Sequence, residues 1–369
     1  MRKLLNKQIK RAAFLLLLLT IGLISCLDPI DLDIPRGFEE TLVIQSVLTR
    51  GNPSVIDLNV SRLFDFTPES LERVNVRVVE LSDDDGNNME VKRVGIGTYQ
   101  HVFTGAESIS VEVGKSYKVR VSTFDGRVLE STLEPLLDVP EIDSIQFVDA
   151  RREIAIPDQE VRFDSVIRFS LNTPLAAPNT DQNVGLLWDV KGVFELTDSP
   201  TVFGVSQKTC YITRSLDITN VKVFDGYNTD ATEVRDQFLY ETPFTFVFAE
   251  GFFLEVTQSS LSPGAVSYWD QINELLEREG DMFEAPAGQL TTNLVNINDP
   301  EDKILGYFYA TSTSTERVYV SPEFARNPRK HCPPPADIPA PPGGCALPLC
   351  CDCLDEPIST TLRPGYWID

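Results

Sequence analysis

From about residue 38 onward, apolar and polar residues alternate along the chain with the period of two that is typical of half-buried β-strands. Val119 and Val121, for example, alternate with Lys118 and Arg120. Seven such segments in under 100 residues, with no helical period, predict an immunoglobulin-like β-sandwich over residues 38–138. The segments are residues 42–46, 56–61, 74–78, 89–91, 98–102, 117–122 and 128–133.

A second β-rich domain is predicted over residues 139–325. Pro135 and Pro140 bracket a change in the pattern, which places the domain boundary near Asp138. Residues 326–369 are rich in proline and cysteine, so we expect a tail with little regular structure that packs on the second domain and is held there by disulfides. The strands expected in the second domain are residues 142–147, 161–171, 186–196, 209–213, 244–248, 252–258, 293–296, 304–308 and 317–320, the last of which closes the sheet.

One helix is predicted in the second domain, over residues 263–279. Ser262 is a good N-cap, Pro263 suits the first helical position, and Gly280 is a typical stop. An apolar stripe at helical spacing includes Tyr268 and Trp269. We interpret these two side chains as core contacts; the alternative is that they stack on a sugar.

The N-terminal segment has the pattern of a bacterial lipoprotein signal. A basic start leads into an apolar run over residues 12–24, which is shorter than the roughly 20 residues of a membrane span. The run ends in Leu23-Ile24-Ser25-Cys26, an aliphatic residue, a small residue and then the cysteine that receives lipid. We therefore predict a signal peptide over residues 1–25, acyl chains on Cys26 and a short acidic tether over residues 26–37; an ordinary cleaved signal is the alternative.

The chain is strongly acidic. It has 32 Lys and Arg against 55 Asp and Glu, a net charge of −23. Removal of the signal takes away five basic residues and leaves 27 against 55, a net of −28. This charge disfavours binding to nucleic acid and to anionic lipid surfaces, because both depend on Lys and Arg that neutralise phosphates.

Beyond Cys26 the chain has six cysteines, an even number that favours disulfides outside the cytoplasm. The sequence leaves their pairing open, except that neighbours are not expected to bond to each other. A zinc site that includes His331 is the alternative, although the spacing is not that of repeated Cys-x-x-Cys pairs. The six candidates are Cys210, Cys332, Cys345, Cys350, Cys351 and Cys353.

No motif fixes a reaction. The chain has two histidines, so few residues could act as the base in Ser-His-Asp or Cys-His catalysis. His101 is expected to be an ordinary strand side chain. Residues 83–87, Asp-Asp-Asp-Gly-Asn, have the composition of a calcium loop without its glutamate at position 12, so we interpret them as a hairpin turn. We predict no catalytic residue, no metal and no cofactor.

Several short motifs, taken in order, resemble a family of Bacteroidota lipoproteins, the domain-of-unknown-function family 4249. Thr292 departs from the glycine that the resemblance leads us to expect there. The motifs are the lipobox with its acidic lead-in, Gly97-Thr98-Tyr99, Gly114-Lys115-Ser116-Tyr117, Val139-Pro140-Glu141-Ile142-Asp143-Ser144-Ile145, Leu261-Ser262 before Tyr268-Trp269, Ile304-Leu305-Gly306-Tyr307-Phe308, and the cysteines 350–353 before Pro364-Gly365-Tyr366-Trp367.

The resemblance implies a lipoprotein of the outer membrane, exposed on the cell surface and encoded beside a SusC-like TonB-dependent receptor. It implies no established activity and brings no catalytic residues. We therefore expect a non-enzymatic accessory or substrate-capture subunit of such a transporter. The alternatives are a free-standing glycan- or peptide-binding module and a hydrolase that uses two carboxylates.

Overall fold

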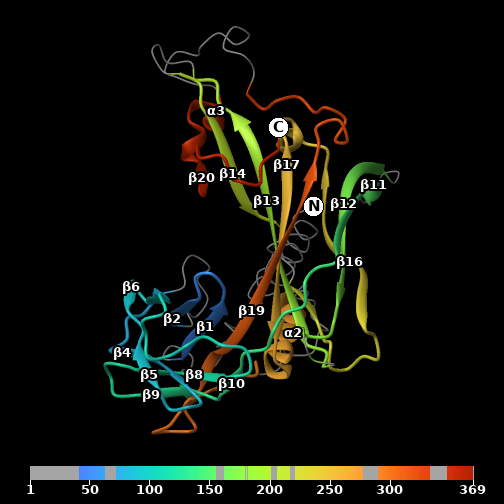
Figure 1. Ribbon diagram of the computed structural model, residues 1–369. Coiled ribbons are helices and arrows are strands. Elements are labelled where there is room, and N and C mark those ends of the chain that lie inside the picture. The colour runs from blue at the N-terminus through green and yellow to red at the C-terminus, as the bar shows by residue number, and fades with distance from the viewer. Residues whose placement is uncertain are drawn as a thin grey trace, which may run out of the picture. The chain divides into compact units, whose positions relative to one another are not determined.

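The computed structural model shows a mainly β protein with multiple sheets, as predicted (Figure 1). Residues 40–369 form one compact unit. No helix among the described residues has the length and apolarity needed to cross a membrane. The structure describes residues 41–62, 72–154, 162–178, 180, 182–200, 206–216, 221–276, 290–332 and 347–368; the predicted signal, Cys26 and the tether lie outside these ranges.

The first two sheets pack face to face around an apolar core in the N-terminal part of the chain. Alternation along each strand sends every second side chain inward, so Ile44 and Leu58 from one sheet meet Val121 from the other. One sheet includes β1 (Leu42–Arg50), β2 (Val55–Arg62), β3 (Glu72–Arg73), β6 (Arg93–Gly95) and β7 (Thr98–Val102), and the other has β4 (Val78–Asp83), β5 (Asn88–Glu90), β8 (Ser116–Ser122), β9 (Val128–Ser131), β10 (Glu134–Pro135) and β18 (Leu294–Asn296).

This N-terminal sandwich takes two of its strands from the region that the sequence assigned to the second domain. β18 pairs with β9, and the first nine residues of β19 (Ile304–Val320) pair in parallel with the whole of β1, from Leu42 beside Ile304 to Arg50 beside Ser312. The sequence predicted two separate strands at residues 304–308 and 317–320, whereas β19 is one strand of 17 residues. In Figure 1 the orange strand β19 therefore belongs to both halves of the chain.

Beyond β19 the same sheet continues through the C-terminal half, and among the described residues it has eleven strands. One of its faces packs on a three-stranded sheet, with Phe169 and Leu171 against Leu186 and Leu254. The remaining strands of the large sheet are β13 (Gly185–Thr197), β14 (Thr209–Ser215), β15 (Lys222–Phe224), β17 (Phe252–Leu261) and β20 (Ser359–Thr360), and the small sheet has β11 (Ser144–Ile154), β12 (Arg162–Pro174) and β16 (Glu233–Pro243).

Helix α2 (Pro263–Leu276) is the predicted helix, and residues 277–279 of that prediction lie outside the described residues. Ser262 caps it as expected, because its Oγ accepts a hydrogen bond from the N–H of Ala265 at 3.2 Å. The helix packs on Leu187 and Tyr307, whose strand neighbours Leu186 and Phe308 point into the two apolar cores on the opposite face. Thus α2 covers the face of the large sheet that the three-stranded sheet leaves open.

Two predicted strands are wrong. Of the strand predicted at residues 74–78, only Val78 is in a strand, the first residue of β4, because the backbone N–H and C=O of Val76 bond to the Tyr99 hydroxyl instead of to a neighbouring strand.

The second is the strand predicted at residues 244–248. Residues 244–248 contain a 3₁₀ turn, η1 (Phe246–Phe248), in which only Phe248 is fully buried. The apolar run Phe-Thr-Phe-Val-Phe has the composition of a strand, but its aromatic side chains cap the end of the core and pack against β13, with Phe194 and Phe246 rings 6.2 Å apart. Two further short helical segments lie in the tail, α3 (Pro348–Cys351) and η2 (Cys353–Asp355).

Candidate functional site

Two hollows adjoin each other beside α2, and Trp269 and Tyr309 line both of them. The first, of about 180 Å³, lies on the side of β1 and β2. The second, of about 390 Å³, lies on the side of β13 and β15. The first is lined by Gln45, Ser46, Val47, Asp57, Asn59, Tyr268, Trp269, Tyr307 and Tyr309, and the second by Leu187, Trp188, Asp189, Val190, Ser215, Leu216, Val221, Lys222, Trp269 and Tyr309.

The alternation of β19 places its tyrosines at these hollows. Because Phe308 points into the core of the N-terminal sandwich, Tyr307 and Tyr309 on either side of it point to the face that carries α2. The Tyr307 ring stacks on the Tyr268 ring of the helix at 5.1 Å, with 27° between the planes. Strand and helix therefore build one aromatic surface from two segments that lie about 40 residues apart in the sequence.

Trp269 is the half-buried member of this surface. Its ring lies edge-to-face against Tyr268 at 5.5 Å and against Tyr309 at 6.2 Å. Its indole Nε1 is buried and makes no hydrogen bond of normal geometry within the described residues. The prediction of core contacts holds for Tyr268, which is buried, and Trp269 packs on the same apolar cluster. Both side chains also line the first hollow, and Trp269 lines the second.

Planar polar side chains lie next to the aromatic surface in the first hollow. Gln45 on β1 is directly opposite Asn59 on β2. Asp57 is two residues before Asn59 on the same strand, so all three side chains lie on one face of the sheet. Asp57 Oδ1 accepts a hydrogen bond from Gln100 at 2.7 Å. Asn59 Oδ1 accepts from Arg73 at 3.2 Å, and no donated bond of its Nδ2 is seen within the described residues. The hollow thus offers amide donors and carboxylate and amide acceptors beside aromatic rings.

A buried carboxylate, that of Glu134, holds in place one of the tyrosines that line the first hollow. Glu134 accepts hydrogen bonds from Ser262 Oγ at 2.6 Å, Tyr307 Oη at 2.8 Å and Asn293 Nδ2 at 3.2 Å. Burial raises the pKa of Glu134, and these three donors oppose that rise. Burial and the Glu134 carboxylate both raise the pKa of Tyr307, so its phenol stays protonated and donates. Glu134 therefore fixes Tyr307 and the start of α2 relative to each other.

Four of the six candidate cysteines join into two disulfides, as predicted. Cys210 on β14 bonds to Cys353, and Cys332 bonds to Cys350 rather than to its neighbour. Together with the pairing of β20 on β14 and the buried Trp367, these bonds hold the tail on the C-terminal half of the large sheet. Cys26 and Cys345 lie outside the described residues. Cys351 lies on α3, with its Sγ 3.2 Å from the carbonyl oxygen of Leu347.

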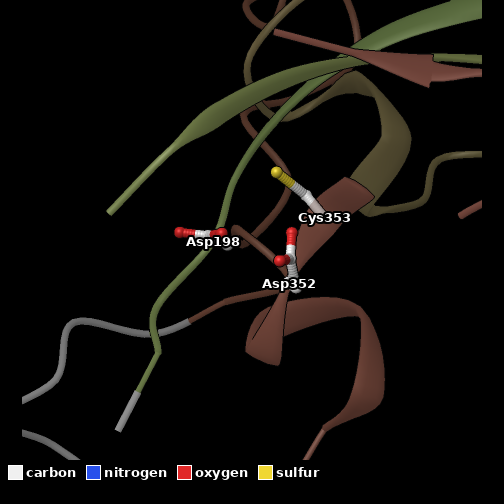
Figure 2. A group of neighbouring side chains, drawn as sticks. All are labelled: Asp198, Asp352 and Cys353. Carbon is white, nitrogen blue, oxygen red and sulfur yellow. The ribbon is translucent and has the colours of Figure 1, made fainter. Parts of the chain in front are cut away.

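The disulfides also bear on the zinc alternative. Cys353 comes together with Asp198 and Asp352 (Figure 2), but its sulfur is bonded to Cys210 and is not a thiolate. Asp352 pairs with Lys208 Nζ at 2.7 Å, and Asp198 Oδ1 accepts from the Lys208 N–H at 2.7 Å. The group is a polar contact between the tail and the segment that joins β13 to β14, and the ring of His331 packs on Phe246 with centroids 4.2 Å apart.

The other polar groups that the sequence singled out have structural roles. His101 on β7 contacts Glu107 at 3.0 Å, and bonds from the backbone of Thr104 lower the pKa of Glu107 to about 2. Asp83, at the end of β4, accepts two bonds from Asn87, from the backbone at 2.8 Å and from Nδ2 at 2.9 Å. Residues 83–87 thus form the predicted hairpin turn between β4 and β5.

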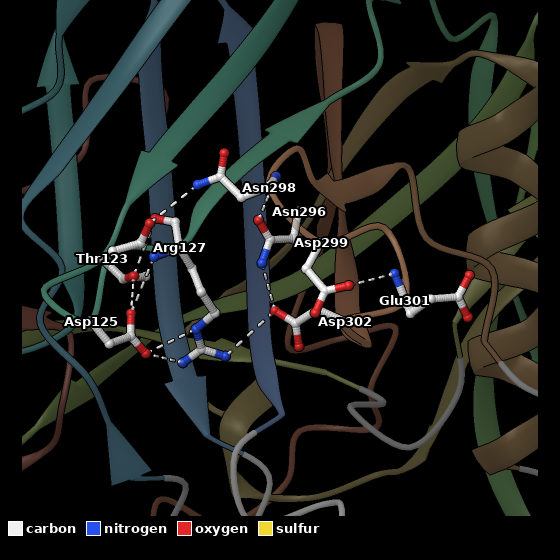
Figure 3. Close-up of polar contacts among 9 residues, drawn as sticks. Thr123, Asp125, Arg127, Asn296, Asn298, Asp299, Glu301 and Asp302 are labelled. Atoms are coloured by element: carbon white, nitrogen blue, oxygen red, sulfur yellow. Dashed lines mark hydrogen bonds and ion pairs between the residues drawn. The ribbon is translucent and has the colours of Figure 1, made fainter.

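A second acidic loop, residues 299–302, follows β18 and lies against the β8–β9 hairpin (Figure 3). Asp302 accepts from Asn296 Nδ2 at 2.9 Å and lies 3.8 Å from Arg127, which also pairs with Asp125 at 2.8 Å. Asn298 donates to the carbonyl of Gly126 at 3.3 Å. These bonds fasten β18 to the sandwich that it completes.

Sequence patterns alone missed most of the aromatic hollows. The predicted strand at residues 304–308 includes Tyr307 but not Tyr309, and the sequence of a single strand does not say which element covers each of its faces. A signal was present: the alternation Tyr307-Phe308-Tyr309 puts two phenols on one face, and Asp57 and Asn59 alternate with buried Leu58. Such a face, polar and aromatic at once, is typical of a binding surface.

A family model described as a domain of unknown function, DUF4249, matches residues 27–317. The match begins directly after Cys26 and includes β1, α2 and most of β19, and hence all the residues that line both hollows. Searches of curated proteins and of solved structures find no match.

Proposed function

We propose that this chain, which belongs to the DUF4249 family, is a lipid-anchored, non-enzymatic subunit that captures a substrate at the cell surface for a SusC-like TonB-dependent transporter. The observation that carries the proposal is the position of the lipobox, Leu23-Ile24-Ser25-Cys26, immediately before the family match. Two or three acyl chains on Cys26 hold a protein at a membrane effectively permanently, at about 0.8 kcal/mol per buried CH₂.

The aromatic hollows support capture. They combine apolar faces with a few polar groups at fixed positions, which is the usual composition of a small-molecule site. Asp57 and Asp189 each lie in one hollow, and each is engaged, Asp57 with Gln100 and Asp189 with Lys191 Nζ at 3.0 Å. This arrangement favours binding over the two-carboxylate hydrolysis that the sequence left open.

A pull-down from outer membranes in a gentle detergent tests the proposal. Because Trp367 is buried against Tyr211 and Phe253, an affinity tag should follow Asp369 through a flexible linker. We expect co-purification of a β-barrel receptor. Recovery of the chain alone, under conditions that keep a known receptor complex intact, contradicts the proposal.

The second candidate is a free-standing surface module that binds a glycan or a peptide without a dedicated transporter. The half-buried Trp269 between two hollows favours it as much as it favours the first. The two candidates share a ligand site and differ in the receptor, so the pull-down separates them. A gene for a TonB-dependent receptor beside the gene for this chain adds weight to the first.

A further inference from the structure

We propose that the two hollows beside α2 bind an uncharged oligosaccharide, with one sugar unit on each side of Trp269. This inference names the class of substrate for the proposed capture function. It rests on that function only because it takes the two hollows as the capture site. Three observations carry it: the chemistry of the first hollow, the charges around both hollows, and their size.

The first hollow presents the two kinds of group that a sugar ring needs. A pyranose has apolar C–H faces, which stack on aromatic rings, and a rim of hydroxyls, each of which donates and accepts a hydrogen bond. Trp269 and Tyr309 supply ring edges and faces, and Gln45, Asp57 and Asn59 supply planar donors and acceptors on the adjoining strands. A purely apolar ligand would cover the remaining donors and acceptors of these groups, such as Asn59 Nδ2, without replacing their contacts with water, which costs free energy.

The charges favour an uncharged ligand. The chain's net charge of −23 repels anions such as phosphates and acidic polymers. A cationic ligand meets Lys222 in the second hollow and Lys191 beside Asp189, while Asp57 is already engaged by Gln100. Asp189 is thus paired with Lys191, whereas Asp57 in the first hollow has a hydrogen bond only from a neutral amide and can still accept one from a ligand. A sugar hydroxyl supplies such a donor without a charge of its own.

The sizes favour two units rather than one. Small-molecule sites usually have about 300–1,000 Å³. The first hollow, at about 180 Å³, is below that range, and the second, at about 390 Å³, is near its lower end. Each one alone suits a ring-sized unit, and the shared wall of Trp269 and Tyr309 makes them adjacent, so an oligosaccharide that crosses Trp269 uses both.

Tryptophan fluorescence gives a direct test. The chain has three tryptophans: Trp367 is buried in the tail, Trp188 is largely buried but lines the second hollow, and Trp269 lines both hollows. A ligand in either hollow therefore lies beside an indole. The full mature chain, made without acyl chains as Cys26→Ser, is titrated with hexasaccharides of glucose, mannose and N-acetylglucosamine in α- and β-linkages. We expect at least one of them to shift the emission, with an affinity that is unchanged between 50 mM and 500 mM NaCl.

Three variants identify the site. Trp269→Ala should weaken the binding, measured by calorimetry, by about tenfold or more, because it removes the stacking surface. Gln45→Ala, at an exposed position of β1, should weaken it by a smaller factor without affecting folding. Phe124→Ala is the matched control, since this aromatic side chain is 72% exposed on the β8–β9 hairpin and should change nothing.

Each result decides the proposal. Binding that Trp269→Ala and Gln45→Ala weaken, and Phe124→Ala does not, supports it. No binding of any neutral saccharide overturns it, and so does binding only to a basic peptide or amine, with an affinity that falls steeply with salt. The pull-down decides the transporter separately: saccharide binding without a receptor refutes the transporter alone, and a receptor without saccharide binding refutes this inference alone.

Discussion

Gly306 and Ile44 lie side by side in the parallel pairing of β19 with β1, so closely that a β-carbon on Gly306 would lie 1.9 Å from the carbonyl oxygen of Ile44. Gly306 also has a φ of +99°, which residues with a side chain rarely adopt. Only glycine lets the two strands meet here, directly before Tyr307. The join between the two halves of the large sheet, and the aromatic hollows beside it, therefore depend on this position.

Gly306→Ala should lower the free energy of unfolding by roughly 2–5 kcal/mol, since it combines backbone strain with a clash against the chain of β1. Denaturation in urea measures the loss. Gly86→Ala is the matched control, because Gly86 has a similar φ of +87° with nothing near its missing side chain, so only the strain of about 1–2 kcal/mol remains. Equal losses of unfolding free energy in the two variants would show that the close approach of Gly306 to Ile44 does not contribute to the destabilisation.

Replacing Glu134 should change how stability depends on pH. Burial raises the pKa of Glu134 in the folded chain, so its contribution to stability is complete below the unfolded pKa of about 4.3 and is lost as the pH rises through the folded-state pKa. Glu134→Gln stays uncharged throughout. The stability of the variant relative to the natural chain should therefore increase from pH 4 to pH 8, in urea unfolding at each pH.

A constant difference between the two chains across that range would contradict the burial of an ionisable Glu134. Ser262→Ala removes one of its three donors and serves as a second variant. Because a donor stabilises the charged form, its loss should raise the pKa of Glu134 further and make the pH dependence steeper.

The two disulfides should differ in their contribution to stability. Cys210 and Cys353 are 143 residues apart, whereas Cys332 and Cys350 are 18 apart. Chain-entropy arguments give about 5 kcal/mol for the longer loop and about 3 kcal/mol for the shorter. Guanidinium unfolding of the double alanine variants of each pair measures both losses. Peptide mapping should confirm that no new bond forms, and a larger loss from the shorter loop would overturn the ordering.

Cys26→Ser should release the chain from the membrane. Mass spectrometry of the natural protein is expected to show an N-terminus at Cys26 that carries acyl chains, and membrane fractionation should find it in the outer membrane. Cys345→Ser, the control, should keep both properties. An unmodified N-terminus at another residue would refute the anchor and, with it, the transporter proposal.

The sequence predicted the strands better than it predicted their partners. Alternation identified β1, β2, β5, β7, β8 and β9, since a sandwich strand shows its buried face in its own residues, but it placed a strand at residues 74–78, ahead of β4. It also identified α2 from Ser262, Pro263 and the apolar stripe. The strand predicted at residues 244–248 is wrong because a run of aromatic residues has the composition of a strand in either of two cases: when it pairs with another strand, or when, as here, it covers the end of a core.

Long-range pairing was beyond the reach of a local pattern. Nothing in residues 42–50 says that their neighbour is residues 304–312, so the parallel pair and the shared sheet could not be foreseen. The candidate site has the same origin, because Gln45, Trp269 and Tyr309 come from three distant segments. The local hints were the pair Tyr268-Trp269 and the alternation Tyr307-Phe308-Tyr309, and the half-buried Trp269 is the residue that lines both hollows.

The pairing of β1 with β19 also sets an order of events during synthesis. With about 250 residues between the two strands, β1 has no permanent neighbour on that edge until nearly the whole polypeptide has been made. Until then the edge exposes unpaired backbone groups, a template for aggregation. The N-terminal sandwich of this protein is thus completed only after residues 304–312 have been made, and a nascent chain released before residue 304 should be a target for holding chaperones and proteases.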